Sequence, residues 1–272
     1  MSGVIGPQRE IIWRQARADE APPARPESSA EARARLESGN ADFARLGDRG
    51  GQQISSVGPE AFGLPAVDGD GVPQEPFAAV LACSDARAPV EMLFNQAGNS
   101  IFVVRTAGFV LGRESLGSLN YAVGNLPTVK MVTVLGHTDC GAMTAAADAL
   151  LSPQAYLDIL HDPSLRAIVD ALLAGVRMAD VALVDAYGRD VRDSPRFRSA
   201  LIDLAATANA AITAVVLNRT VGCPVSFGVF NLNNRTVGVG GPDGWRAGLL
   251  DPPADERELG ALLSRGADAA AL

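Results

Sequence analysis

The chain has 272 residues, of which 47% are hydrophobic and 20% charged, enough to bury a sizeable core. Its formal net charge of −8 argues against binding to nucleic acid or to an anionic membrane surface, because both favour basic proteins. No uninterrupted apolar run reaches the roughly 18 residues of a spanning helix, and the first residues lack the apolar core of a signal peptide. We therefore expect a soluble, cytoplasmic protein with no membrane partner.

The first part of the chain predicts an arm, a helix and a loop. Residues 1–28 are rich in Pro, Arg, Ala and Glu without periodicity, which is typical of an extended arm or a disordered tail. Residues 29–46 have a helical pattern that Gly39-Asn40 could break. Residues 47–76 contain many Gly and Pro and predict a long loop. We treat residues 29–272 as a single domain.

From Phe77 onward, apolar strands alternate with helical segments. Strands are predicted at 77–82, 101–105 and 129–135, with helices after Pro89, at 115–125 and at 141–151. This βαβαβα order implies a parallel sheet with right-handed crossovers. The predicted fold is therefore α/β, with a central, mostly parallel sheet flanked by helices and an N-terminal helical arm.

The remaining residues predict a helical region and a C-terminal hairpin. Residues 155–212 are mostly helical, with breaks at 161–163 and 193–195, and a short apolar segment follows at 214–217. Strands at 226–231 and 235–240 are joined by Asn233-Asn234, a hairpin signal. The glycine-rich residues 237–244 indicate a turn after the last strand, since no helical pattern follows them as in a phosphate-binding loop.

Two of the predicted strands end in residues that bind metal ions. Cys83 ends the first strand, and His137 and Cys140 follow the third. Two cysteines and one histidine are a ligand set of catalytic zinc sites, which keep a fourth position open. The alternative is that both cysteines are small buried hydrophobic residues and His137 is a core histidine. The chain has only three cysteines, and an odd, sparse set favours metal binding or catalysis over disulfides.

Asp85 and Arg87 accompany the first of these cysteines. In an extended segment they share a face with Cys83, and Arg87 can hold Asp85 in its ionised form. The alternative is an ordinary surface ion pair, worth about 0–1 kcal/mol. The remaining cysteine, Cys223, predicts a core or loop thiol, and the second histidine, His161, predicts an exposed turn residue.

These residues resemble the β-class carbonic anhydrases. That family combines a Cys-Ser-Asp-Ser-Arg segment with a His-x-x-Cys-Gly segment, which here read Cys83-Ser84-Asp85-Ala86-Arg87 and His137-Thr138-Asp139-Cys140-Gly141. Residues 36–43 and 117–123 are also similar to family segments. The resemblance runs from Glu31 to about Leu151 and is weaker over residues 215–239.

The resemblance implies a zinc lyase that reversibly hydrates carbon dioxide to bicarbonate and a proton through zinc-bound hydroxide. It implies one Zn²⁺ per chain, held by Cys83, His137 and Cys140, and an Asp85–Arg87 dyad that orients the nucleophile. It also implies a homodimer or higher homo-oligomer. Two rival functions stay open: hydrolysis of carbon disulfide or carbonyl sulfide on the same scaffold, and non-catalytic zinc binding or thiol sensing with four protein ligands.

The resemblance further implies a substrate pocket formed by Gln74, Phe102, Tyr121 and Gly141. A loop amide for Gln74 and plain core positions for Phe102 and Tyr121 are the alternatives. Val80 stands where one branch of the family has a Trp that binds bicarbonate at an inhibitory site, so the chain is similar to the plant-like, open-site branch. The sequence departs from the family pattern at three places. Ala86 replaces Ser, and Ala88 replaces a larger apolar residue. Residues 105–109 read Arg-Thr-Ala-Gly-Phe where the family usually has Arg-Asn-Ala-Gly-Asn.

Overall fold

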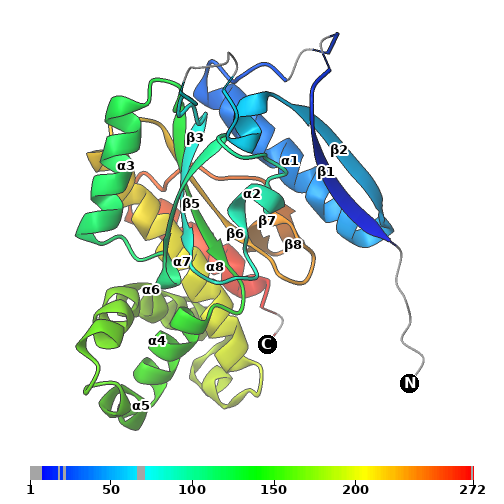
Figure 1. Ribbon diagram of the computed structural model, residues 1–272. Coiled ribbons are helices and arrows are strands. Elements are labelled where there is room, and N and C mark those ends of the chain that lie inside the picture. The colour runs from blue at the N-terminus through cyan, green and yellow to red at the C-terminus, as the bar shows by residue number, and fades with distance from the viewer. Residues whose placement is uncertain (1–7, 18, 21–22, 66–70, 271) are drawn as a thin grey trace.

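A six-stranded sheet with the order β4-β3-β5-β6-β7-β8 forms the centre of the protein in the computed structural model (Figure 1). The structure describes residues 8–17, 19–20, 23–65, 71–270 and 272. The strands are β3 (Ala78–Cys83), β4 (Ile101–Thr106), β5 (Met131–His137), β6 (Val225–Phe230), β7 (Val237–Gly241) and β8 (Gly244–Ala247). Strands β4, β3, β5 and β6 pair in parallel, and β7 and β8 continue the sheet in antiparallel fashion. The predicted α/β class is confirmed.

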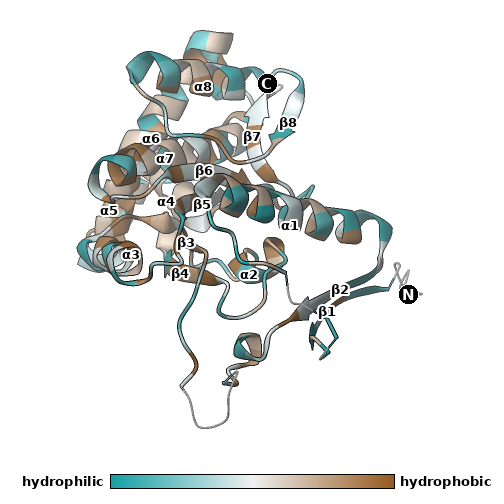
Figure 2. Ribbon diagram, turned by 90° about the horizontal axis from the view of Figure 1, so that it is seen from above, coloured by the Kyte–Doolittle hydropathy of each residue, from teal (hydrophilic) through white to brown (hydrophobic). Residues whose placement is uncertain are grey.

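Helices cover both faces of this sheet. They are α1 (Ser29–Arg49), α2 (Val90–Leu93), α3 (Arg113–Asn125), α4 (Gly141–Leu151), α5 (Pro153–Asp158), α6 (Pro163–Tyr187), α7 (Phe197–Thr220) and α8 (Glu256–Asp268). Short 3₁₀ turns lie at η1 (Pro59–Phe62), η2 (Ala107–Phe109) and η3 (Arg189–Asp193). The apolar strands lie between helices whose outer faces are hydrophilic (Figure 2).

Strand β3 shows how the sheet is buried on both sides. Alternate side chains point to opposite faces of a strand. Ala79, Leu81 and Cys83 join the core under α3, α4, α6, α7 and α8. The other three residues of β3 join the smaller core under α1 and α2. The end of β3 therefore delivers Cys83 to the larger core.

Helix α7 runs through that larger core. Among the described residues it is the one helix long and apolar enough to cross a membrane by length and composition. Of its most apolar window, 72% is buried inside the protein. Its apolar character is therefore accounted for by packing against α6 and the sheet.

The structure corrects the sequence-based expectation in the N-terminal region. Strand β1 (Arg9–Gln15) pairs in parallel with β2 (Gly51–Val57), where the sequence predicted an arm and a loop. Residues 1–7, 18 and 21–22 of the predicted arm and 66–70 of the predicted loop lie outside the described residues. The two strands flank α1, so β1-α1-β2 is a separate crossover unit beside the main sheet (Figure 1).

Three smaller expectations also differ. Residues 214–217 are the continuation of α7 rather than a separate apolar segment, and β8 follows the turn after β7. Helix α1 is unbroken at Gly39-Asn40. A Cβ on Gly39 would lie 1.8 Å from the Phe94 carbonyl oxygen, so this glycine permits close packing of α1 against α2.

Candidate metal centre

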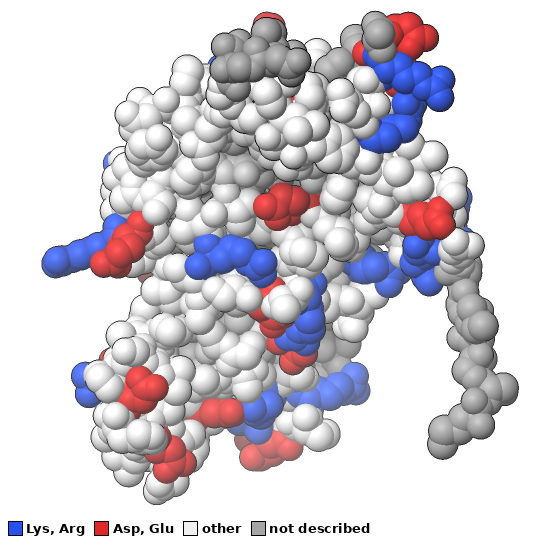
Figure 3. All heavy atoms as spheres, in the orientation of Figure 1, with Lys and Arg blue, Asp and Glu red and all other residues white. Residues whose placement is uncertain are grey.

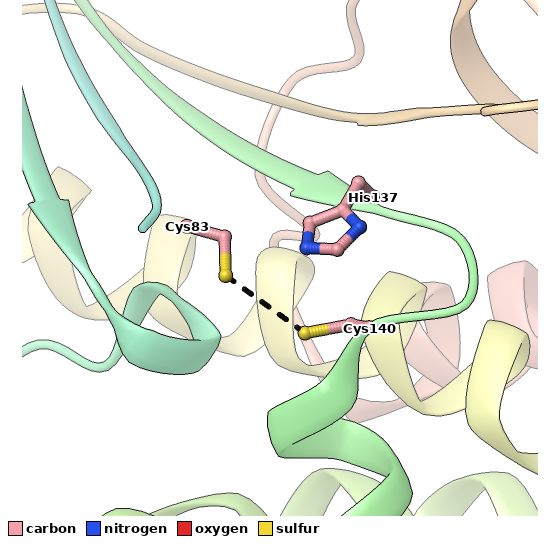
Figure 4. A group of neighbouring side chains, drawn as sticks. All are labelled: Cys83, His137 and Cys140. Carbon is pink, nitrogen blue, oxygen red and sulfur yellow. Dashed lines mark hydrogen bonds between the residues drawn. The ribbon is translucent and has the colours of Figure 1, made fainter. Parts of the chain in front are cut away.

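The parallel register brings the three predicted metal ligands together at one edge of the sheet. Ala82 pairs with Leu135, so β3 and β5 end side by side. Cys83 is the last residue of β3, His137 the last of β5, and Cys140 the residue before α4. Their ligand atoms all lie within 4.8 Å of one another, and the two sulfurs are 4.0 Å apart (Figure 4).

The imidazole of His137 is oriented for a ligand at one nitrogen. Its Nδ1 lies 2.9 Å from the backbone oxygen of Thr138, so Nδ1 carries the proton and donates it to that carbonyl. Its Nε2 is buried and has no hydrogen-bond partner among the described residues. A buried lone pair without a partner is costly, and a metal ion beside the two sulfurs would satisfy it.

The pKa values of the two thiols shift in opposite directions. Hydrogen bonding from Cys140, assisted by His137, lowers the pKa of Cys83. The neighbouring Cys83 and burial raise the pKa of Cys140. Burial opposes protonation of His137, but the Cys83 thiolate outweighs it and raises the imidazole pKa. These shifts favour the thiolate at Cys83 and the thiol at Cys140, and a divalent cation would displace the proton of the latter.

The start of α4 counteracts a small part of the effect of burial on the pKa of Cys140. The backbone N–H groups of Ala142 and Met143 donate to its sulfur and lower its pKa. Free N–H groups and the dipole at a helix N-terminus favour thiolate. A Cβ on Gly141, the first residue of α4, would meet no atom within 4 Å, so this position faces open space. The Cys₂His group therefore fits Zn²⁺, which prefers such nitrogen and sulfur donors.

Asp85 and Arg87 form the predicted ion pair beside this group. Arg87 Nε lies 3.0 Å from Asp85 Oδ1, Arg87 Nη2 lies 2.8 Å from Oδ2, and the Arg87 backbone N–H donates to Oδ1 at 2.8 Å. Hydrogen bonding from Arg87 lowers the pKa of Asp85 to about 2. Asp85 Oδ2 is 3.8 Å from His137 Nε2. An ionised carboxylate, able only to accept hydrogen bonds, thus borders the metal-binding group.

Comparison with known proteins agrees with this arrangement. A family model described as carbonic anhydrase matches residues 78–180, which contain both motifs. "Carbonic anhydrase" of Mycolicibacterium smegmatis is 40% identical over 114 residues, covering 42% of this chain and 54% of that protein. Residues 78–180 are therefore similar to the carbonic anhydrase family. They contain all three residues of the Cys₂His group, Cys83, His137 and Cys140.

Further matches are shorter or more distant. "Carbonic anhydrase 2" of Mycobacterium tuberculosis is 46% identical over 77 residues, or 28% of this chain and 37% of that protein. The chain thus spans about half, or less, of the length of these two curated relatives. A structure of tetrameric β-carbonic anhydrases from the ascomycete Sordaria macrospora aligns with a TM-score of 0.48 and 19% identity. That alignment covers 61% of this chain and 80% of that chain.

Within the matched segment, the sequence interpretation missed one supporting residue. Arg105, on β4, donates to the backbone oxygens of Cys83 at 2.9 Å, of Asp85 at 2.5 Å and of Ala88 at 3.4 Å. It thereby ties down the segment that carries a metal ligand and the carboxylate. The signal that could have revealed it is register, because Arg105 pairs with Ala82 immediately before Cys83.

The four predicted pocket residues are not all assembled around the metal-binding group. Phe102 and Tyr121 pack against each other, with ring centroids 6.4 Å apart. Phe102 pairs with Ala79, four residues before Cys83, about 13 Å along the strand at the usual rise per residue. Tyr121 is 51% exposed, and Gln74 is exposed before β3. Within one chain, only Gly141 directly adjoins a metal-binding residue.

Proposed function

We propose that the protein is a zinc-dependent β-carbonic anhydrase that catalyses the reversible hydration of carbon dioxide to bicarbonate and a proton. One observation carries the proposal: a buried Cys-His-Cys group with an unpartnered imidazole nitrogen adjoins an ionised carboxylate. The family match of residues 78–180 supports it. The three free cysteines fit a reducing compartment such as the cytoplasm.

The residues that would hold one Zn²⁺ are Cys83 and Cys140 through sulfur and His137 through Nε2. Zinc in such a site lowers the pKa of its water from 15.7 towards about 7 and so supplies a nucleophile at neutral pH. Because its pKa is about 2, Asp85 stays ionised at that pH and can accept a hydrogen bond from the nucleophile. This contact fixes which lone pair faces the substrate carbon. Arg87 holds the carboxylate in that orientation.

The proton released by hydration must leave the site. Asp85 is a poor acceptor for it, since its pKa is about 2. Buffer or an exposed side chain would carry the proton away. The basic and acidic side chains on the face in Figure 3 are interspersed rather than gathered in one patch. This fits a small, neutral substrate and gives no footprint for nucleic acid.

We propose that the substrate pocket is completed by a second copy of the chain. Phe102 and Tyr121 are packed together beside β4, an edge strand of the sheet, and Tyr121 is half exposed. Within one chain these rings lie far along the strand from Cys83. A homodimer or higher homo-oligomer would let them wall the apolar slot of a neighbouring chain. Gln74 would donate to a substrate oxygen, and Gly141 would leave room for it.

The test is stopped-flow hydration of carbon dioxide by purified protein, together with its zinc content. We expect about one zinc per chain and a hydration rate that falls to the buffer background in Cys83→Ser, which removes a thiolate ligand. Parallel assays with carbonyl sulfide and carbon disulfide would reveal the alternative hydrolase. Zinc-loaded wild-type protein that hydrates no carbon dioxide would overturn the proposal, and a fourth protein ligand in metal spectroscopy would point to a non-catalytic site.

A further inference from the structure

We infer that Asp139 and Asp203 are positioning residues that lock the two ligand-bearing segments together through Arg87. The inference deepens the proposed function and rests on the metal site described there. One segment carries Cys83 and Asp85, and the other is the turn between His137 and Cys140. Direct side-chain hydrogen bonds connect them.

Arg87 is shared between these segments. Its Nε and Nη2 hold the Asp85 carboxylate at 3.0 and 2.8 Å. Its Nη1 lies 2.8 Å from Asp139 Oδ2, and its Nη2 also lies 2.9 Å from the Asp139 backbone oxygen. The Arg87 side chain is 49% exposed, so burial does not fix it. Asp139 supplies the second hold that keeps the guanidinium from pivoting about Asp85.

The conformation of Asp139 is itself held in place. It lies between two metal ligands with a φ of 52°, in the left-handed region that Asp and Asn tolerate better than most residues. Its backbone N–H donates to Asp203 Oδ1 at 2.8 Å. Asp203 lies on α7, where the adjacent Leu204 and Ala205 are buried in the larger core. The turn is thus anchored to a rigid helix.

The far side of the turn is fixed by Thr138. Its backbone N–H donates to the Phe230 oxygen at 3.0 Å, and its Oγ1 accepts from the Leu232 N–H at 3.0 Å. The turn is therefore held on one side by the end of β6 and on the other by Asp203. A continuous series of contacts then runs from Asp203 through Asp139 and Arg87 to Asp85.

The same contacts therefore fix the positions of the metal ligands and of the Asp85 carboxylate. Residues that orient a metal's ligands typically account for about 10–100-fold in metal affinity or activity. Asp139 acts through Arg87, so its predicted effect depends on that residue. Removing the Asp139 carboxylate breaks one hydrogen bond of Arg87, whereas removing Arg87 breaks that bond together with its bonds to Asp85 and to the Asp139 backbone. Adding the Asp139 change to the loss of Arg87 should therefore add little.

The primary test measures how fast zinc passes from the loaded protein to a chelator. Asp139→Gly keeps the left-handed turn and removes the carboxylate, and we expect about tenfold faster loss of zinc. We expect Arg87→Ala to speed zinc loss at least as much, because it also removes the bonds to Asp85. The double variant should stay within about twofold of Arg87→Ala. A double variant whose effect is the product of the two single effects, or loss within twofold of wild type in Asp139→Gly, would overturn the inference.

Asp203 is tested by a matched pair of variants. Asp203→Ala removes the acceptor for the Asp139 N–H and should speed zinc loss about tenfold. Asp203→Asn keeps an acceptor oxygen and should stay within twofold of wild type. Equal losses in both variants would refute the role of this hydrogen bond. Asp148→Asn is the control, since Asp148 makes a similar two-bond pair with Arg198 on the surface.

These outcomes are separable from the proposed function. Zinc loss to a chelator requires no turnover. It therefore tests the positioning role of Asp139 and Asp203 even in a protein that hydrates no carbon dioxide. In an active protein, we expect Asp139→Gly to lower kcat about tenfold while KM stays within twofold, because Asp139 orients Asp85 without touching substrate. A rise in KM alone would contradict that role.

Discussion

Replacing Asp85 by Asn is expected to remove a pH-dependent part of the stability. In the folded protein, hydrogen bonding from Arg87 lowers the Asp85 pKa from 3.8 to about 2. At about 1.36 kcal/mol per pKa unit this corresponds to roughly 2 kcal/mol. The Arg87 side chain is 49% exposed and the Asp85 side chain 18%, so solvent screening reduces the expected contribution to about 1 kcal/mol.

The sign follows from the direction of the shift. A carboxyl whose folded pKa is depressed stabilises the protein above its unfolded pKa, and this stabilisation is lost as pH falls through the folded value. For Asp85 the loss should occur between about pH 4 and pH 2. The free energy of unfolding of Asp85→Asn should therefore lie about 1 kcal/mol below wild type at pH 6 and approach it near pH 2.

The assay is urea unfolding of the metal-free protein at a series of pH values, with chelator present so that metal binding does not contribute. A difference between wild type and Asp85→Asn that stays constant from pH 6 to pH 2.5 would refute the ion-pair reasoning. At pH 7.5, zinc-loaded Asp85→Asn should hydrate carbon dioxide at least about tenfold more slowly with zinc near one per chain. A rate within twofold of wild type would remove Asp85 from the mechanism.

Three further predictions concern Asn40, Arg105 and zinc removal. Asn40→Ala should lower the free energy of unfolding, measured by urea denaturation, by about 2–3 kcal/mol. The reason is that the buried Asn40 amide hydrogen-bonds the backbone of Leu93, Arg235 and Val237. A loss under about 0.5 kcal/mol would contradict this. Arg105→Met should weaken zinc affinity about tenfold in chelator competition, by freeing three carbonyls of the ligand-bearing segment, and unchanged affinity would refute it. Stripping zinc should lower Tm, and re-addition should restore it.

The metal centre could be predicted from the sequence because its geometry follows from the sheet. Cys83 and His137 each end an apolar run, and parallel neighbouring strands place their carboxyl ends together. Three positions separate His137 from Cys140, which a single turn can span. The α4 bounds match those predicted from the alanine-rich pattern. Local pattern and simple topology were sufficient for this part.

Elements that depend on long-range pairing were not predictable. Strand β1 pairs with β2 across the whole of α1, and no local signal in either segment specifies that partner. Helix α7 continues through residues 214–217 because that apolar segment packs in the core as helix, where a short run is ambiguous between helix and strand. Gly39-Asn40 predicted a helix break, but both residues make tertiary contacts within an unbroken helix. Gly39 allows the Phe94 carbonyl to approach closely, and the Asn40 side chain hydrogen-bonds the backbone of Leu93 and Val237.

The supporting contacts of the site divide in the same way. The Asp85–Arg87 pair is local, two residues apart, and the sequence indicated it. The contacts that hold this pair come from Arg105, 20 residues after Asp85, from Asp139, 52 residues after Arg87, and from Asp203, 64 residues beyond Asp139. A short motif can therefore specify which atoms would hold a metal, while the rigidity of the site comes from residues whose identity the motif does not specify. Variants of Arg105, Asp139 and Asp203 should for this reason alter zinc retention as strongly as changes to the orienting pair itself.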